Sequence, residues 1–309
     1  MDDIKIIKKV DFVNPVMIAG WQGMGNFAIG VVEYLRRKLD ASEIAEIVVD
    51  PMATLDAVMV EDGFAHFPPS PRNIFYYCKS PELIIFEGEA QLPGHNGIAL
   101  LNKVLDAAFR FKVKRIYTGA AFPLPISHKE VPAVYGAANR KELTQEFSKH
   151  EVIPMEGGHI SGLNGLILGF AQERNIEAIC LLATMPQYAI SLPNPKASSA
   201  IVETLQEMLG FQVNLHELEE YSKDMDEKMS LIEDRVKDVF TIDNEHPKPP
   251  APSAHHKKIP GNIIEKIEKL FQEAKKDKSK AIILKKELDR WDLYKVYEDK
   301  FLDLFKENQ

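Results

Sequence analysis

The sequence has few cysteines and no apolar run of the length that a membrane span requires. Cys78 and Cys180 are the only cysteines among 309 residues, and both lie in apolar, strand-like runs. This setting is typical of buried, reduced thiols, so we expect neither a disulfide framework nor a metal site on this pair. Because the first residues, MDDIKIIKKVD, also lack the apolar region of a secretory signal, we expect a cytoplasmic protein without membrane contact.

An excess of positive charge is absent as well. The 38 Lys and Arg residues are outnumbered by 46 Asp and Glu residues, which gives a net charge of -8. Binding to nucleic-acid phosphates requires clustered cations, so we do not expect a nucleic-acid partner. The sequence also contains no G-x-S-x-G, HExxH or paired CxxC motif. We therefore expect no resident metal or cofactor, and the balance favours a protein that is not an enzyme.

Strand-like and helix-like segments alternate along the first three quarters of the chain. Apolar, strand-like runs occupy residues 15–20, 44–49, 73–78, 82–86, 115–119 and 177–183. Helical spacing occupies residues 27–39, 98–111, 140–149, 162–174, 198–209 and 215–240. This alternation predicts an α/β fold with three α/β/α layers and a mostly parallel sheet. Turn residues between positions 53 and 71 predict an exposed loop or hairpin.

The end of the chain differs from the rest in composition. Residues 243–260 are rich in proline, small residues and charge, which is typical of a linker. We therefore divide the chain into a core at 1–242, a linker at 243–260 and a helical extension at 261–309. The extension is too rich in aromatic residues to bury them alone, so we expect it to dock on the core or on another chain. The apolar seam of the 215–240 helix could pack on its own subunit or on a partner helix.

The stretch PMEGGHISGLNGLILG, residues 154–169, is the most glycine-rich part of the chain. Gly157 and Gly158 follow a short strand, Ser161 occupies a position typical of a helix N-cap, and Gly162 begins a helix with few side chains on one face. A helix N-terminus preceded by glycines offers free N–H groups to an anion. Close packing of the helix on the sheet explains the glycines equally well.

A second glycine turn follows the first apolar strand. The segment GMGNFA, residues 23–28, fits the dinucleotide-binding pattern G-x-G-x-x-A between a strand and a helix. However, Trp21 and Gln22 lengthen the turn beyond the tight crossing that a pyrophosphate needs, and Pro51 follows the expected ribose-binding acid, Asp50. We therefore favour a chance match.

Two acid-histidine groupings lie in glycine-containing loops. One is Glu87 and Glu89 with His95, and the other is Glu156 with His159. Either grouping could support acid-base chemistry in a cleft, although solvated loop charges are the more common interpretation. Taken together, the candidate ligand-binding residues are Gly20, Trp21, Gly25, Asn26, Glu87, His95, Gly157, Gly158, Ser161, Gly162 and Asn164.

Three segments together resemble a known family. They are GWQGMGNFAIGVVEYL, GGHISGLNGLILGFAQERNI and LLATMPQYAISLPNPKASSAIVETLQEMLGFQVN. Over residues 10–240 the chain resembles the proteasome assembly chaperone 2 family in its archaeal and bacterial branch. The resemblance implies a three-layer fold related to phosphorylases and peptidyl-tRNA hydrolases, and homo-oligomers that are often trimers. It also implies a chaperone or scaffold role, since archaeal relatives bind proteasome subunits.

Two features depart from the family pattern. Relatives that engage the proteasome use a C-terminal tail with a hydrophobic residue, a tyrosine and one further residue, whereas this sequence finishes KENQ. We therefore do not expect proteasome docking by that route. The linker and the helical extension are additional to the common core.

Three hypotheses for the function follow from these observations. The first is a non-catalytic homo-oligomer that binds a protein partner, with the two glycine turns lining a shared cleft. The second is an enzyme or a small-molecule protein that binds phosphate, a carboxylate or a nucleotide, where Asn26 and Asn164 orient the ligand and Glu87 or His95 acts as base. The third places the interaction on the aromatic residues of the extension.

Overall fold

The computed structural model describes residues 4–49, 57–89 and 91–242, together with 267, 269–274, 280, 284, 285, 288 and 297. The chain forms two compact units, residues 1–242 and 243–309. In the second unit, residues 269–274 are helical, and the ring of Phe271 lies 5.6 Å from that of Tyr297. The linker at 243–260 and most of the aromatic residues of the extension lie outside the described residues.

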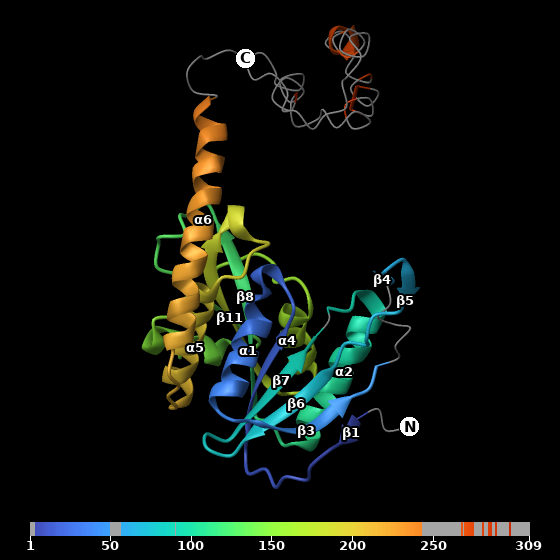
Figure 1. Cartoon of the computed structure of the whole chain (residues 1–309), viewed down its shortest axis with the longest axis vertical. Coiled ribbons are helices and arrows are strands. Elements are labelled where there is room, and N and C mark those ends of the chain that lie inside the picture. Colours follow the sequence, from blue (N-terminus) through green and yellow to red (C-terminus); the bar gives the residue numbers. More distant parts are fainter. Residues whose placement is uncertain are drawn as a thin grey trace. The chain divides into compact units, whose positions relative to one another are not determined.

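A nine-stranded sheet forms the middle layer of the first unit (Figure 1). In spatial order its strands are β1 (Ile4–Ile6), β3 (Ser42–Ile47), β6 (Asn73–Cys78), β7 (Leu83–Gly88), β2 (Val16–Trp21), β8 (Arg115–Leu124), β11 (Glu177–Pro186), β9 (Val134–Ala138) and β10 (Ile153–Pro154). The strands predicted from apolar runs are all present, and β8 and β11 continue beyond the predicted boundaries.

Helices cover both faces of this sheet. On one face lie α1 (Phe27–Lys38) and α5 (Pro195–Leu209), and on the other lie α2 (Gly94–Arg110) and α4 (Leu163–Glu173). The remaining helices are α3 (Lys141–Thr144), α6 (His216–Ile242) and the 3-10 turns η1 (Met24–Asn26), η3 (Phe147–His150) and η4 (Gln187–Ala189). Each face has its own cluster of buried apolar side chains. The predicted α/β fold with three layers is therefore confirmed.

The sheet is mixed rather than mostly parallel. Strands β7, β2, β8 and β11 pair in parallel, whereas β1–β3, β3–β6, β6–β7 and β11–β9 pair antiparallel. The turn at 79–82 between β6 and β7 explains one of these antiparallel pairs. A parallel connection needs a crossover of a dozen or more residues, so strands joined by four residues must run in opposite directions.

A separate two-stranded hairpin stands apart from this sheet (Figure 1). It consists of β4 (Met59–Glu61) and β5 (Phe64–His66), which pair antiparallel. The prediction of an exposed loop or hairpin between positions 53 and 71 is therefore confirmed in its hairpin form, and residues 53–56 of that range lie outside the described part of the chain.

Helix α6 packs on its own subunit in its first half. Leu218 joins the apolar cluster around α1 and α5, and Met225 and Met229 pack against Ala189 of η4. The first half of this apolar seam therefore packs on the same subunit. In the described part of the chain, no helix combines the length and the apolar character that crossing a membrane demands.

Candidate functional site

A pocket of about 360 Å³ lies near the carboxyl ends of β2, β8 and β11. Gly23 and Met24 line it from the turn between β2 and α1, while Ser161 and Asn164 line it from the segment that enters α4. Helices α1 and α4 lie on opposite faces of the sheet. Open α/β sheets characteristically bind ligands in such a crevice outside the carboxyl ends of their strands.

The pocket has apolar walls and a small set of polar side chains. Apolar walls come from Phe27, Phe122 and Leu182, and small residues of β8 separate them. The polar residues are Gln91, His159, Ser161, Asn164 and Gln187. Among the described residues that line the pocket there is no Asp, Glu, Lys or Arg.

The first backbone N–H of α4 already has a side-chain partner. Its N-cap is Gly162, with a φ of 78°, and the cap makes no side-chain hydrogen bond. The backbone N–H of Leu163 instead donates to Oε1 of Gln91 at 3.0 Å. The prediction that Ser161 caps this helix is therefore wrong, because the chain reaches the helix in a left-handed conformation that favours glycine.

Asn164 ties α4 to the end of β2. Its Oδ1 accepts hydrogen bonds from the backbone N–H of Trp21 at 3.0 Å and from the hydroxyl of Thr118 at 3.2 Å. Its Nδ2 donates to the backbone carbonyl of Trp21 at 3.3 Å. The amide is buried, so these bonds satisfy groups that have no access to water. Asn164 thus lines the pocket with a side chain whose polar atoms bind the protein itself.

The glycine turn after β2 does not have the form that a dinucleotide requires. Gly25 has a φ of 63°, and its N–H donates to the carbonyl of Ile190 at 2.8 Å. A Cβ at this glycine would lie 3.0 Å from the carbonyl oxygen of Leu192. The middle glycine of the motif therefore packs against the loop after β11, and its neighbour Asn26 adopts a left-handed conformation. A pyrophosphate needs that glycine backbone to be open.

Gly20 and Trp21 serve the packing of β2. A Cβ at Gly20 would lie 2.5 Å from the carbonyl oxygen of Ala28, so this glycine allows α1 to approach the strand closely. The Trp21 side chain is fully buried on the opposite face and lies against Phe86 and Gly88. Neither residue lines the pocket described above.

Glu87 and His95 lie away from the pocket. Glu87 is buried and accepts a hydrogen bond from Nε of Arg36 at 2.5 Å. Burial raises the pKa of its carboxyl, and the Arg36 guanidinium opposes this rise. Because α2 begins at Gly94, earlier than expected, His95 is an exposed residue of its first turn rather than of a loop.

Gly157 and Gly158, the adjacent glycines of the 154–169 stretch, are exposed. Gly157 lines a second hollow of about 350 Å³, with Tyr135 and Met155, and Gly158 has a φ of 121°. Of the predicted candidates, the structure thus brings Ser161 and Asn164 to the pocket beside the Gly23 turn, where His159 joins them.

A polar network outside the predicted candidate residues holds α6 against the core. Nδ1 of His128 lies 2.6 Å from a carboxylate oxygen of Glu233, and Nε2 lies 2.9 Å from the hydroxyl of Ser230. The hydroxyls of Tyr188 and Ser127 each donate to the same Glu233 oxygen at 2.8 Å. Burial raises the pKa of the Tyr188 hydroxyl, so it remains a donor to this carboxylate.

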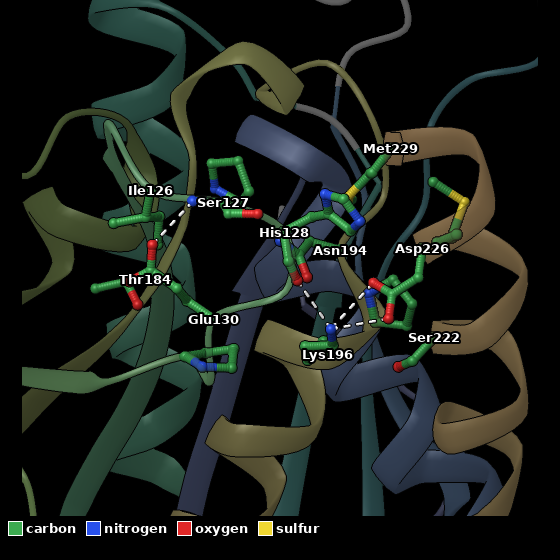
Figure 2. Close-up of a pocket in the computed structure, with 14 residues that line it drawn as sticks. Ile126, Ser127, His128, Glu130, Thr184, Asn194, Lys196, Ser222, Asp226 and Met229 are labelled. Atoms are coloured by element: carbon green, nitrogen blue, oxygen red, sulfur yellow. Dashed lines mark hydrogen bonds and ion pairs between the residues drawn. The ribbon is translucent and has the colours of Figure 1, made fainter. Parts of the chain in front are cut away.

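An ion pair continues this network at the start of α5 (Figure 2). The ammonium of Lys196 lies 3.0 and 2.9 Å from the two carboxylate oxygens of Asp226, and it donates to the carbonyl of His128 at 2.9 Å. In Figure 2, dashed lines join the Lys196 ammonium to the Asp226 carboxylate and to the backbone carbonyl of His128. The hollow between them is only about 10 Å³, so it has room for no more than a water molecule.

The order serine, histidine and acid in this network matches the hydrogen-bonding order of a hydrolase triad. Ser230, however, lies within α6, where the backbone N–H groups bond to the helix itself. Within the described part of the chain, α6 itself therefore offers Ser230 no free N–H pair to stabilise an oxyanion. A structural role in docking α6 fits this geometry.

The sequence did contain one signal for this network. Asp226, Ser230 and Glu233 recur at spacings of four and three, directly after apolar seam residues, so they form a polar stripe along one side of the seam. His128 has no such pattern, because it lies in an irregular segment between β8 and β9.

Comparison with known families and proteins gives matches over most of the chain. The model of the PAC2 family matches residues 17–233. The uncharacterized protein MJ1210 of Methanocaldococcus jannaschii is 27% identical over 237 residues, which cover 74% of this chain and 89% of that protein.

Solved structures with the same fold include three described in relation to the proteasome. Pyrococcus furiosus PbaB, an archaeal proteasome activator, is 25% identical with a TM-score of 0.63, covering 75% of this chain and 100% of that one. Pyrococcus furiosus PbaA, an archaeal homolog of proteasome-assembly chaperone, is 20% identical with a TM-score of 0.59, and the match covers 76% of this chain and 99% of that one. The proteasome-assembly chaperone homologue Rv2125 of Mycobacterium tuberculosis is 20% identical with a TM-score of 0.58, and the match covers 70% of this chain and 94% of that one.

Proposed function

Because the chain belongs to the PAC2 family, we propose that it acts as a non-catalytic assembly chaperone or scaffold that binds a protein partner. The description of PbaB as a proteasome activator directs this proposal to proteasome subunits as the partner class. We further propose that the protein is cytoplasmic and forms a homo-oligomer, with a trimer as the expected form.

The structural observation that supports the homo-oligomer is the exposed apolar hairpin formed by β4 and β5. Five large apolar side chains project from it into solvent: Val58 (53% exposed), Met59 (40%), Val60 (64%), Phe64 (73%) and Phe67 (63%). Contiguous apolar patches on a soluble protein mark sites of protein contact. A lone two-stranded hairpin is also marginally stable in water, so a covering partner would stabilise it. We assign this hairpin to contact with further copies of the chain, which are always available to cover it.

Light scattering coupled to size exclusion tests the assignment. The double substitution Phe64→Ser/Phe67→Ser should reduce the oligomer to a smaller species, because it removes the two most exposed aromatic rings of the hairpin. The matched control is Phe109→Ser, which removes an equally exposed ring from α2. A wild-type protein that is strictly monomeric and captures no proteasome subunit in a pull-down would count against both the oligomer and the chaperone role.

The extension provides a further arm of the same experiment. Deletion of residues 243–309 should leave the oligomer intact if the hairpin carries self-association. If the aromatic residues of the extension carry partner binding, the same deletion should abolish capture of the partner while the core remains folded.

A second candidate function is the binding of a small molecule in the pocket beside Gly23 and Ser161. The volume of about 360 Å³ falls in the range of ligand sites, and both glycine turns contribute to its lining. Thermal-shift screening with phosphate, nucleotides and nicotinamide cofactors distinguishes an anion site from other kinds of pocket. A panel without any shift would remove phosphate and nucleotides as ligands.

A further inference from the structure

We infer that the pocket beside Gly23 and Ser161 takes a small, uncharged ring compound with an amide-like hydrogen-bonding group. This inference rests on the second candidate function and is independent of the chaperone role. It combines four properties of the pocket: the charge of its lining, the state of the α4 N-terminus, its size and its unpaired polar groups.

The charge of the lining argues against an anion. Burying an ionised carboxylate or phosphate is costly unless a cation or several N–H donors compensate for the lost water. No Lys or Arg is found among the described residues that line the pocket. The first N–H of α4, which could have served an anion, is bonded to Gln91 at 3.0 Å. An uncharged ligand avoids this desolvation cost.

The size and the walls of the pocket favour a single flat ring. Its volume of about 360 Å³ is near the lower end of the range for ligand sites, about 300–1,000 Å³. Phe27, Phe122 and Leu182 supply apolar wall area, and Gly119 and Ala120 leave room between them. A ring buries its faces against such walls without leaving polar groups unpaired.

The polar residues of the pocket can pair with an amide. The side chains of His159, Ser161 and Gln187 make no hydrogen bond with other residues in the described part of the chain. Gln91 uses its oxygen for Leu163, so its NH₂ group can donate to a ligand. Gln187 and Ser161 can each donate and accept. This set complements the adjacent donor and acceptor of a carboxamide.

The test uses two pairs of ligands that differ in charge and little else. Benzamide and nicotinamide are uncharged, whereas benzoate and nicotinate place a carboxylate on the same rings. Saturation-transfer NMR and calorimetry on the full chain should show that each amide binds about tenfold or more tightly than its acid. Equal or tighter binding of the acids would overturn the inference, as would the absence of binding by both amides.

A pocket-filling variant locates the binding site. A Cβ at Gly23 would meet only Nδ2 of Asn164, at 3.8 Å, so Gly23→Leu extends into the pocket without a clash at its base. This variant should lose amide binding, whereas Gly169→Ala on the far part of α4 should retain it. Gln187→Ala gives a second variant at an exposed position, and it should weaken binding of the amides more than binding of the acids. Retained affinity in both pocket variants would place the ligand elsewhere.

The outcome is separable from that of the chaperone proposal. The hairpin variants report on oligomer mass and partner capture, and they do not alter the pocket. Gly23→Leu should in turn leave the oligomer mass unchanged. If the amides do not bind, only the proposed pocket ligand is refuted. If the hairpin variants do not change the oligomer mass, the result on amide binding is unaffected.

Discussion

The side-chain oxygen of Asn164 accepts a hydrogen bond from the backbone N–H of Trp21 at 3.0 Å, across 143 residues of sequence. Because Asn164 also donates to the carbonyl of Trp21, it completes both backbone bonds at the point where β2 leaves the sheet. The N-terminus of α4 and the turn at Gly23 are thereby held together, and they are the two sides of the pocket.

Replacing this amide should destabilise the protein measurably. In Asn164→Ala the buried N–H of Trp21 loses its acceptor, so the free energy of unfolding should fall by about 1–3 kcal/mol. Urea unfolding followed by tryptophan fluorescence measures the change. Thr118→Val is the control, because it removes a hydroxyl that bonds the same Asn164 oxygen and leaves both bonds to Trp21 in place. An equal loss of stability in the two variants would show that the bonds to Trp21 contribute little.

Two glycines of α4 should respond oppositely to alanine. A Cβ at Gly165 would lie 2.1 Å from the carbonyl oxygen of Ile160, whereas a Cβ at Gly169 would meet nothing within 4 Å. Gly165→Ala should therefore cost about 1–3 kcal/mol through overpacking, and Gly169→Ala should stabilise the helix by about 0.5–1 kcal/mol. Thermal unfolding of the two variants tests the contrast. A stable Gly165→Ala would show that the 160–162 segment can move away.

These glycines show what the sequence could and could not predict. The glycines at 162, 165 and 169 predicted a helix face open to close approach, and this holds for two of them: Gly162 lies against Gln91 and Gly165 against the preceding turn at Ile160. A Cβ at Gly169 would meet nothing within 4 Å, so the prediction is wrong there. The choice of the partner depends on the path of the 155–161 loop, which no periodic pattern encodes. The alternation of apolar runs, in contrast, predicted the layers and the strands, because burial of a sheet between helices imposes it. The family resemblance read from three segments is likewise confirmed by the match over residues 17–233.

The network around Glu233 should control how firmly α6 is docked. Glu233→Gln keeps an acceptor but removes the charge that attracts His128 and the hydroxyls of Tyr188 and Ser127. A charge-assisted hydrogen bond contributes about 1.5–3 kcal/mol, so amide exchange in residues 222–233 should accelerate roughly tenfold or more. Exchange followed by mass spectrometry measures this change.

An exposed residue of the same helix gives the control. Glu227→Gln alters the charge of α6 by the same amount at an exposed position and should leave the exchange of residues 222–233 nearly unchanged. Equal acceleration in both variants would indicate a general effect of helix charge instead of the loss of docking.

Glu87 makes the stability of the core dependent on pH. Burial raises its pKa above the ordinary value of 4.5, so the folded protein holds this proton more tightly than the unfolded chain does. The resulting stability is present below about pH 4.5 and is lost as the pH rises through the folded-state pKa. Relative to Glu87→Gln, the wild type should therefore lose free energy of unfolding as the pH rises above about 4.5.

Arg36 determines how large this loss is. Its guanidinium lies 2.5 Å from the Glu87 carboxylate and opposes the effect of burial, so Arg36→Met should steepen the loss with pH. Urea unfolding of the three proteins across the pH range gives the comparison. A wild type that gains stability over Glu87→Gln as pH rises would show that the ion pair outweighs burial.

The candidate site was harder to predict than the fold for a physical reason. Pocket-lining residues come from five separate segments, and only two of these segments, the Gly23 turn and the 155–164 stretch, lie in glycine-rich patterns. Gln91 and Gln187 belong to no sequence pattern that predicts a site. They line the pocket because they follow β7 and β11, whose carboxyl ends lie at the same edge of the sheet. Glu87 looked available for chemistry in the sequence, but strand alternation turns it toward Arg36 on α1.

The boundary between the core and the extension can be tested by two truncations. A chain that stops after residue 242 keeps all of α6, including the buried side chains of Leu218, Met225 and Met229. We therefore expect it to fold and to unfold cooperatively, as the proposed domain division requires. A chain that stops after residue 214 lacks these side chains, each worth about 1.5–3 kcal/mol when buried, and it leaves His128 without Glu233. Circular dichroism and urea unfolding should show native stability for the first and a large loss for the second, whereas an unstable 1–242 chain would mean that the core depends on residues 243–309.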